Sequence, residues 1–149
     1  MTVPAITAVD NALDALYAKF TAEPTFSKIV WYGPQQPKGN DYIFISANYE
    51  NDLEPQAASA NNPWQETFDL TVEIGVQRSA PDGVWRNVRT RAGAYALTAQ
   101  TIIHNDQFLS NTVERAYVAH KKRNVGFSDE GQMYQFVYTL TVRCTARAF

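Results

Sequence analysis

The residues best suited to chemistry are few and lie far apart in this sequence. The two histidines are His104, expected at the end of a helix, and His120, expected at the end of a strand. Neither has a cysteine or carboxylate at metal-ligand spacing. The single cysteine, Cys144, falls on the same side of an alternating run as Leu140 and Val142. That position is typical of a small core residue, whereas a nucleophile needs exposure and a lowered pKa. These residues predict neither a metal site nor a nucleophile.

Three carboxylates, Glu66, Asp69 and Glu73, are the remaining candidates for acid–base chemistry. They lie in residues 65–78, where apolar side chains fall at every second position. This period of two predicts a strand with one buried face, and it places Asp69 and Glu73 on the opposite, solvated face. Acid–base catalysis would need one of them to be buried. There is no phosphate-binding glycine loop and no nucleophile elbow, so the sequence predicts a protein that is not an enzyme and has no cofactor.

Three aromatic and six basic side chains are better candidates for binding than any residue is for catalysis. The aromatic rings lie in or beside expected loops, where they either cover the chain's own core or anchor a partner. The basic side chains either solvate a helix face and a turn, or dock on an acidic partner or on passing DNA. The interface candidates are Tyr49, Trp64, Trp85, Arg86, Arg89, Arg91, Lys121, Lys122 and Arg123.

The longest elements that would position these residues follow from the spacing of apolar side chains. Apolar residues recur every three or four positions over residues 9–20 and again over residues 88–103, which predicts two helices. They alternate over residues 65–78 and 133–147, which predicts two long strands. The second of these strands would extend about 50 Å, so we expect a bend or bulge in it.

Shorter strands and two polar connections complete the expected order. Strands are predicted at residues 27–32, 41–46 and 112–120, the last with Val113, Tyr117 and Ala119 on one side. Residues 47–64 are rich in Asn, Ala, Ser and Pro and predict a long loop without secondary structure, and residues 121–131 predict a polar connection. This order predicts an α+β fold of one domain, residues 1–149, with a mainly antiparallel sheet packed against two helices.

The composition is that of a soluble globular protein, with 45% hydrophobic and 19% charged residues in 149. One cysteine cannot form an internal disulfide, which indicates a reducing compartment during synthesis. No basic-then-apolar leader opens the chain, and no apolar run approaches the roughly 20 residues of a membrane span. We therefore expect a soluble protein made in the cytoplasm, with no membrane partner.

The net charge of −2 is unevenly distributed along the chain. Residues 1–77 contain ten acidic and three basic side chains, whereas residues 78–149 contain ten basic and five acidic ones. Either the two ends of the fold simply differ in charge, or unlike faces of neighbouring copies meet in an assembly. A protein whose main partner is nucleic acid is usually basic overall, so the composition disfavours that class.

In order and spacing, most of the chain resembles the siphophage tail terminator proteins, the family typified by the lambda tail terminator. The resemblance rests on an opening helix, a long alternating strand, a Gly-containing link followed by a helix with an Arg-x-Arg-Ala step, and a long closing strand. These stretches are residues 11–17, the strand from Gln65, residues 82–92 and residues 136–147. Residues 105–109 and the strand after them lie where that family has a similar connection.

The resemblance implies a structural protein of the virion, made in the host bacterial cytoplasm. Such a subunit forms a hexameric ring on the head-proximal end of the tail tube, ends tube polymerisation and offers a surface to the neck of the capsid. The implied partners are other copies of the chain, the tail tube protein and a neck or head-completion protein. Transient contact with genomic DNA in the lumen is compatible with the same assignment.

Two other classes of protein fit the same pattern of elements. One is another tail or neck component, either a tail tube protein or a head-completion protein, which shares the combination of sheet and helices. The other is a cytosolic α+β protein that binds a small ligand between sheet and helix, with Tyr, Trp and Phe lining the pocket. An enzyme is a distant third.

Overall fold

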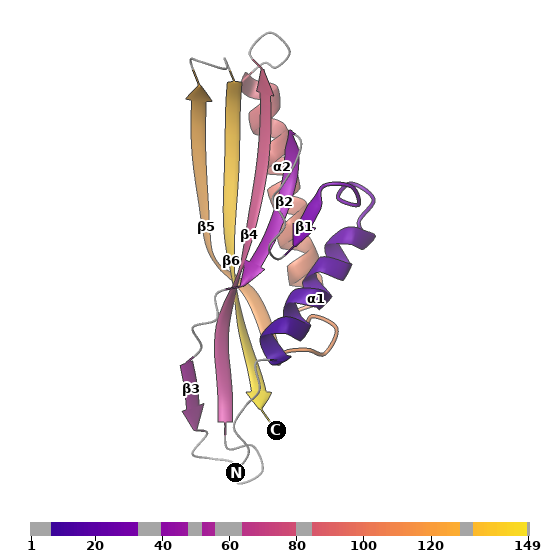
Figure 1. Ribbon diagram of the computed structural model, residues 1–149, viewed down its shortest axis with the longest axis vertical. Helices are drawn as coiled ribbons and strands as arrows, with labels where there is room; N and C mark the ends of the chain where they lie inside the picture. The colour runs from indigo at the N-terminus through magenta and orange to yellow at the C-terminus, as the bar shows by residue number, and fades with distance from the viewer. Residues whose placement is uncertain are drawn as a thin grey trace.

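A computed structural model of the chain describes residues 7–32, 40–47, 52–55, 64–79, 85–128 and 133–148. Two helices and six strands are present in this part of the chain (Figure 1). In order they are α1 (Thr7–Ala22), β1 (Val30–Tyr32), β2 (Asp41–Ala47), β3 (Asp52–Pro55), β4 (Trp64–Ser79), α2 (Trp85–Asn105), β5 (Arg115–Ser128) and β6 (Met133–Ala148). The α+β prediction is confirmed.

The long antiparallel pair β4 and β6 forms the centre of the sheet. Its register runs without a break from Trp64 opposite Ala148 to Ser79 opposite Met133, so the expected bulge does not lie in this pair. Each strand has sixteen residues, which corresponds to about 50 Å of extended chain. The pair therefore sets the length of the molecule and twists along it (Figure 1).

The remaining strands flank this pair in the order β1-β2-β4-β6-β5, with β3 also on β4. Strands β2 and β3 pair with different stretches of β4, β2 near the end that leads to α2 and β3 near the start. All of these pairings are antiparallel except β1 with β2. At the other side, β5 pairs with β6 along its length and has no strand on its second edge among the described residues.

Both helices pack against one face of the sheet, because alternate side chains of the strands are apolar on that face. In β4 the inward positions are the even-numbered residues from Phe68 to Val76, all of which are buried. The inward stripe of α2 is the one expected from the sequence and consists of Val88, Ala92, Tyr95, Ala96, Ala99 and Ile103. The opposite face of the sheet has no helix against it in the described part of the chain.

Two sequence predictions are wrong because edge strands depend on pairing more than on burial. Residues 52–55, expected in a structureless loop, form β3 against the first residues of β4. Residues 121–128, expected in a polar connection, are the second half of β5. Residues 52–55 are too few to establish a period, and three consecutive basic residues precede the short alternation at Val125 and Phe127. Lysines on an edge strand also oppose uncontrolled pairing with other strands.

Strand β5 also differs from the prediction for residues 112–120. It begins at Arg115, and its inward residues before the bulge are Ala116 and Val118. Tyr117, predicted on the same side as Val113, lies on the other face. A bulge at Ala119 interrupts the register between Val118 and His120, so His120 lies in the middle of the strand and not at its end. The bulge moves the inward positions from even to odd residue numbers.

The turn between α2 and β5 is held by Asp106. Its carboxylate accepts hydrogen bonds from the backbone N–H of Phe108 at 3.2 Å and of Ser110 at 2.9 Å, and it lies 2.6 Å from Lys19 Nζ of α1. The three residues from Leu109 to Asn111 have positive φ angles, which are unfavourable without such support. Asp106 therefore fixes the point at which the chain leaves α2 for the edge strand.

Candidate interaction surfaces

Asp41 organises the flank of α2 that faces β2. Its carboxylate accepts hydrogen bonds from Arg78 Nη1 at 2.5 Å, Arg91 Nε at 2.6 Å and Tyr95 Oη at 2.7 Å. The Asp41 side chain is only 10% exposed, while that of Arg91 is 54% exposed. This hub ties β2, β4 and α2 together, and it uses the charge of one of the arginines that we expected to face a partner.

The protonation of Asp41 follows from this environment. Burial alone would raise the pKa of its carboxyl group, but the hydrogen bonds from Arg78, Tyr95 and Arg91 outweigh that effect, and the pKa lies below its ordinary value of 3.8. Burial, followed by the hydrogen bond to Asp41, raises the pKa of the Tyr95 hydroxyl. The hub is therefore an ionised carboxylate held by two cations and a neutral phenol at neutral pH.

The other arginines of α2 lie at its N-terminal end. Arg89 stacks over the ring of Trp85 with its Cζ atom 4.5 Å from the ring centroid, and Trp85 in turn contacts Phe136 of β6 edge-on at 5.8 Å. Arg86 is exposed and borders a hollow of about 510 Å³ that Arg78 and Arg91 also line. The first turn of α2 has no acidic residue, although carboxylates are favoured there by the helix dipole. Among the described residues, the start of α2 is therefore basic.

The basic cluster of residues 121–123 does not form one patch. In a strand, neighbouring side chains point to opposite faces, and the register places Lys121 and Arg123 on the helix side and Lys122 on the uncovered face. Lys121 Nζ donates to Gln100 Oε1 of α2 at 3.4 Å, and Arg123 lies over the ring of Phe136 at 5.9 Å. The predicted cluster thus contributes two residues to one surface and one to another.

The aromatic interface candidates that the structure describes also lie far apart. Trp85 opens α2 beside the residues that pair with the last part of β4, whereas Trp64 opens β4 at the opposite end of the sheet, opposite Ala148. Tyr49 and the side chain of Trp64 lie outside the described residues. Tyr49 and Trp64 as interface residues remain predictions, and Trp85, partly exposed, belongs to the basic end.

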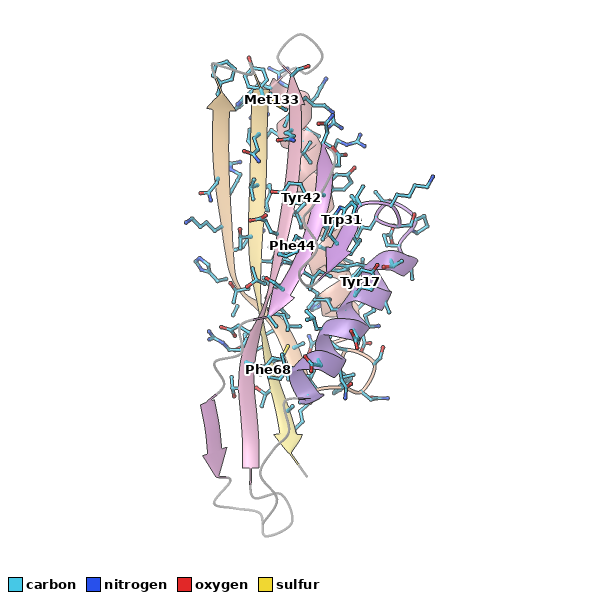
Figure 2. All side chains as sticks on the ribbon, in the orientation of Figure 1. Tyr17, Trp31, Tyr42, Phe44, Phe68 and Met133 are labelled. Carbon is cyan, nitrogen blue, oxygen red and sulfur yellow. The ribbon has the colours of Figure 1, made fainter. Side chains whose placement is uncertain are left out.

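The uncovered face of the sheet has aromatic side chains that the sequence analysis did not single out. Trp31, Tyr42 and Phe44 come from β1 and β2 and lie along one side of that face (Figure 2). The ring of Tyr42 passes over Gly75, where a Cβ atom would overlap it, and its hydroxyl donates to Glu73 at 3.1 Å. The sequence signal was available, because residues 42–45 are apolar or aromatic at every position, which suggests a strand with both faces partly covered.

On the same face, Asp69 and Arg143 form an ion pair at 3.1 Å across β4 and β6. This outcome confirms the solvated strand face predicted for Asp69 and Glu73. The indole N–H of Trp31 is buried and has no hydrogen-bond partner in the structure. A buried donor without a partner costs free energy. Among the described residues, the Trp31 indole N–H on this face is therefore an unsatisfied polar group.

The groups suited to catalysis remain dispersed. Cys144 is fully buried among the core residues of β6, as expected, and burial raises the pKa of its thiol to about 12. His104 is exposed near the end of α2 and His120 is exposed on β5. Within the described ranges, no three His, Cys, Asp or Glu side chains gather in a way that could hold a metal ion. No helix in the same ranges has the length and hydropathy of a bilayer-spanning segment.

Comparison with known proteins gives likenesses among solved structures only. No protein-family model matches the chain, and no curated protein matches it. Among solved structures, the chain is similar to a component of a structure described as "Virion of native gene transfer agent (GTA) particle". The likeness covers 97% of this chain and 100% of the other, with 11% sequence identity and a TM-score of 0.48. A likeness at that level does not show a shared function.

Proposed function

We propose that this chain is a structural subunit of a phage tail, namely a tail terminator that forms a hexameric ring on the head-proximal end of the tail tube. In this role the ring ends tube polymerisation and joins the tail to the head. The observation that carries the proposal is the long free edge of the sheet. It is supported by the succession of motifs, from the opening helix to the closing strand, that resembles the tail terminator family.

The free edge is strand β5, a strand of fourteen residues that pairs with β6 on one side, except at the Ala119 bulge, and with no described strand on the other. An exposed edge of this length is a template for association, and natural proteins shorten, cover or charge such edges. Lys121, Lys122 and Arg123 charge the middle of β5, but Val125 and Phe127 beyond them are apolar and more than half exposed. An edge that is only partly protected fits a subunit whose edge is covered in an assembly.

The two edges of the sheet are unlike, which bears on the kind of assembly. One edge is the long basic strand β5, and the other consists of the short strands β1 and β3, the second of which has two carboxylates in sequence. A contact between unlike surfaces is heterologous, and it produces a ring when its rotation closes. A closed ring is the form that a tail terminator requires.

A tail tube or head-completion protein is the second candidate, and the charge distribution favours it. Among the described residues, basic side chains outnumber acidic ones at the start of α2, and acidic residues are concentrated in the half of the sequence that includes β3 and the start of β4. Copies that stack end to end would bring these unlike charges together. A tube protein would elongate by such stacking, whereas a terminator would cap.

Binding of a small ligand is the third candidate, and it rests on a hollow of about 350 Å³ between α2 and β5. A metabolite bound there would raise the thermal stability of a monomer or dimer, by an amount that grows with the logarithm of the ligand concentration divided by its dissociation constant. The same hollow is open along an edge of the molecule, so it also suits a protein segment.

The deciding experiment measures assembly directly. The mass of the purified chain is determined by analytical ultracentrifugation over a wide range of concentrations, alone and mixed with tail tube protein, and the mixtures are imaged by electron microscopy. Rings and short capped tubes are expected from a terminator. Elongation of the chain by itself would favour a tube protein, and a monomer that neither associates nor alters tube length would refute both.

A further inference from the structure

The strip between α2 and β5 combines exposed apolar side chains with basic side chains that no carboxylate of these two elements neutralises. Neither α2 nor β5 contains an aspartate or glutamate. We call this strip the α2–β5 groove and define it by Trp85, Leu97, Lys121, Arg123, Val125 and Phe127. At one end it widens into the hollow of about 350 Å³ beside Leu97, Gln100 and Val118. At the other end, near the start of α2, it consists of the exposed side chains of Trp85, Val125 and Phe127.

The groove exists because of the bulge at Ala119. Beyond it, the odd-numbered residues of β5 face the helix side of the sheet, and Lys121, Arg123, Val125 and Phe127 lie opposite Leu140, Tyr138, Phe136 and Tyr134. Helix α2 lies over β4 and β6, with Trp85 against Phe136. The inward positions of the outer half of β5 are consequently left without a covering element in the described chain.

Apolar exposure is concentrated in this groove. Five large hydrophobic side chains are exposed among the described residues, and four of them, Trp85, Leu97, Val125 and Phe127, border the groove with exposed fractions of 42–66%. Phe127 also packs against Tyr134 with ring centroids 5.1 Å apart. Exposed apolar side chains gathered in one place mark a binding surface, whereas scattered ones need no explanation.

Charge defines what the groove accepts. Arg89 over Trp85, Arg123 over Phe136 and Lys121 beside Gln100 place three cations along the same strip. Because α2 and β5 contribute no carboxylate, these cations keep their attraction for an acidic partner. The fitting occupant is therefore a segment with carboxylates next to apolar side chains.

The chain itself contains such a segment in β3. Its sequence is Asp52-Leu53-Glu54-Pro55, in which acidic and apolar residues alternate, and its backbone pairs only with β4 among the described strands. Strand β3 lies at the start of β4, opposite residues 64–67, whereas Phe136 and Trp85 lie near the pair of Val76. About nine to twelve residues of extended strand, roughly 30–40 Å, separate β3 from this aromatic end of the groove. The hollow end beside Val118 lies nearer to β3 along the strands, but β4 and β6 stand between β3 and β5 in the sheet. Strand β3 and the groove of one copy therefore do not meet.

We propose that the α2–β5 groove of one copy binds the acidic strand β3 of a second copy. This proposal deepens the proposed function, on which it rests, by naming the two surfaces that meet between neighbouring subunits. The contact is heterologous, since groove and strand are different parts of the chain, and it therefore propagates around a ring.

Charge reversal on each side tests the contact in the full-length chain. Asp52→Lys with Glu54→Lys, and separately Lys121→Glu with Arg123→Glu, should each weaken self-association by about tenfold or more in sedimentation, because each puts like charges together. The four substitutions in one chain restore opposite charges and should return most of the association. Lys121→Glu alone and Lys122→Glu alone are the matched pair, since each makes the same single charge reversal on the same strand but on opposite faces. Lys121→Glu should weaken association, and Lys122→Glu should leave it unchanged. Far-ultraviolet circular dichroism and thermal melting establish that each variant is folded.

Disulfide cross-linking detects the contact even where association is weak. Glu54→Cys with Val125→Cys should give disulfide-linked oligomers in the oxidised protein at about 1 mM, where even contacts of millimolar affinity are populated. Glu54→Cys paired with Lys122→Cys should give far fewer. Cys144 is buried and serves as an internal control for non-specific oxidation.

The outcomes distinguish failure of the groove contact from failure of the proposed ring. Wild-type protein that assembles, with assembly unaffected by either charge-reversed pair, overturns the groove contact and leaves the ring standing. Wild-type protein that stays monomeric, forms no linked oligomer and does not act on tail tubes overturns both. If the Lys121→Glu, Arg123→Glu variant loses binding to a labelled DNA duplex while self-association is unchanged, the groove is a nucleic-acid surface and the proposal is wrong.

Discussion

The two flanks of α2 differ in how their charges are paired. On the flank that faces β2, arginines pair with a carboxylate of the same chain. On the flank that faces β5, neither α2 nor β5 supplies a carboxylate to the basic side chains. The first flank has the Asp41 hub with Arg78, Arg91 and Tyr95. The second has Arg89 and Arg123 stacked on aromatic rings. The comparison separates the basic residues that hold the fold from those available to a partner, a distinction that the count of arginines in the sequence does not make.

The largest expected effect on stability belongs to the paired flank. Replacing Asp41 with alanine leaves Arg78 without its carboxylate partner and the Tyr95 hydroxyl without its acceptor in a largely buried site, so the free energy of unfolding should fall by about 3 kcal/mol. Urea denaturation measures this change. Asp69→Ala removes the exposed pair with Arg143 and should cost clearly less. Equal losses for the two variants would mean that burial does not distinguish the hub from a surface ion pair.

Lowering the pH should remove the stabilisation that the Asp41 carboxylate supplies. The folded-state pKa of Asp41 lies below the ordinary value of 3.8, so the carboxylate stabilises the fold fully above that value. The contribution is lost as the pH falls through the lowered, folded-state pKa. The difference in unfolding free energy between wild type and Asp41→Asn should therefore shrink as the pH is taken from neutral to below 3.8. A difference that stays constant over this range would show that the charge of Asp41 does not stabilise the fold.

The smallest expected effect on stability belongs to the open flank. Val125→Ser with Phe127→Ser should change the free energy of unfolding by less than about 1 kcal/mol, because both side chains are more than half exposed. The same variant should associate measurably less in sedimentation. Val142→Ser, at a fully buried position of the neighbouring strand, is the contrast and should cost about 3 kcal/mol. A large loss of stability in the Val125→Ser, Phe127→Ser variant would show that these two side chains stabilise the fold of the monomer.

The elements with strong periodicity were predictable from the sequence. Helix α1, helix α2 and strands β4 and β6 each bury one regular stripe, and a stripe that is buried by one neighbour leaves a clear period in the residues. Cys144 in the core and Asp69 with Glu73 on the solvated face follow from the same alternation. These predictions succeed because burial acts on each element separately, residue by residue.

The edges and the candidate surfaces were less predictable. Strand β3 is short and acidic, and residues 121–124 of β5 are all polar, so a strand was not expected in either place. Backbone pairing with β4 and β6 holds these segments in the sheet. The bulge at Ala119 shifts the alternation of β5 by one residue, so Val118 and Val125 face the same side although their spacing is odd. No local pattern marks such a shift in advance.

The amino-acid sequence by itself determined the long strands, the two helices, the inward stripe of each and the excess of acid in one half and base in the other. These properties depend on side-chain type and on spacing along the chain, which are local. Only the tertiary structure decided that Asp41 meets Arg78, Arg91 and Tyr95, and that Lys121 and Arg123 are divided from Lys122. Those outcomes depend on which distant strands pair and in what register, because register decides which face of the sheet each side chain occupies.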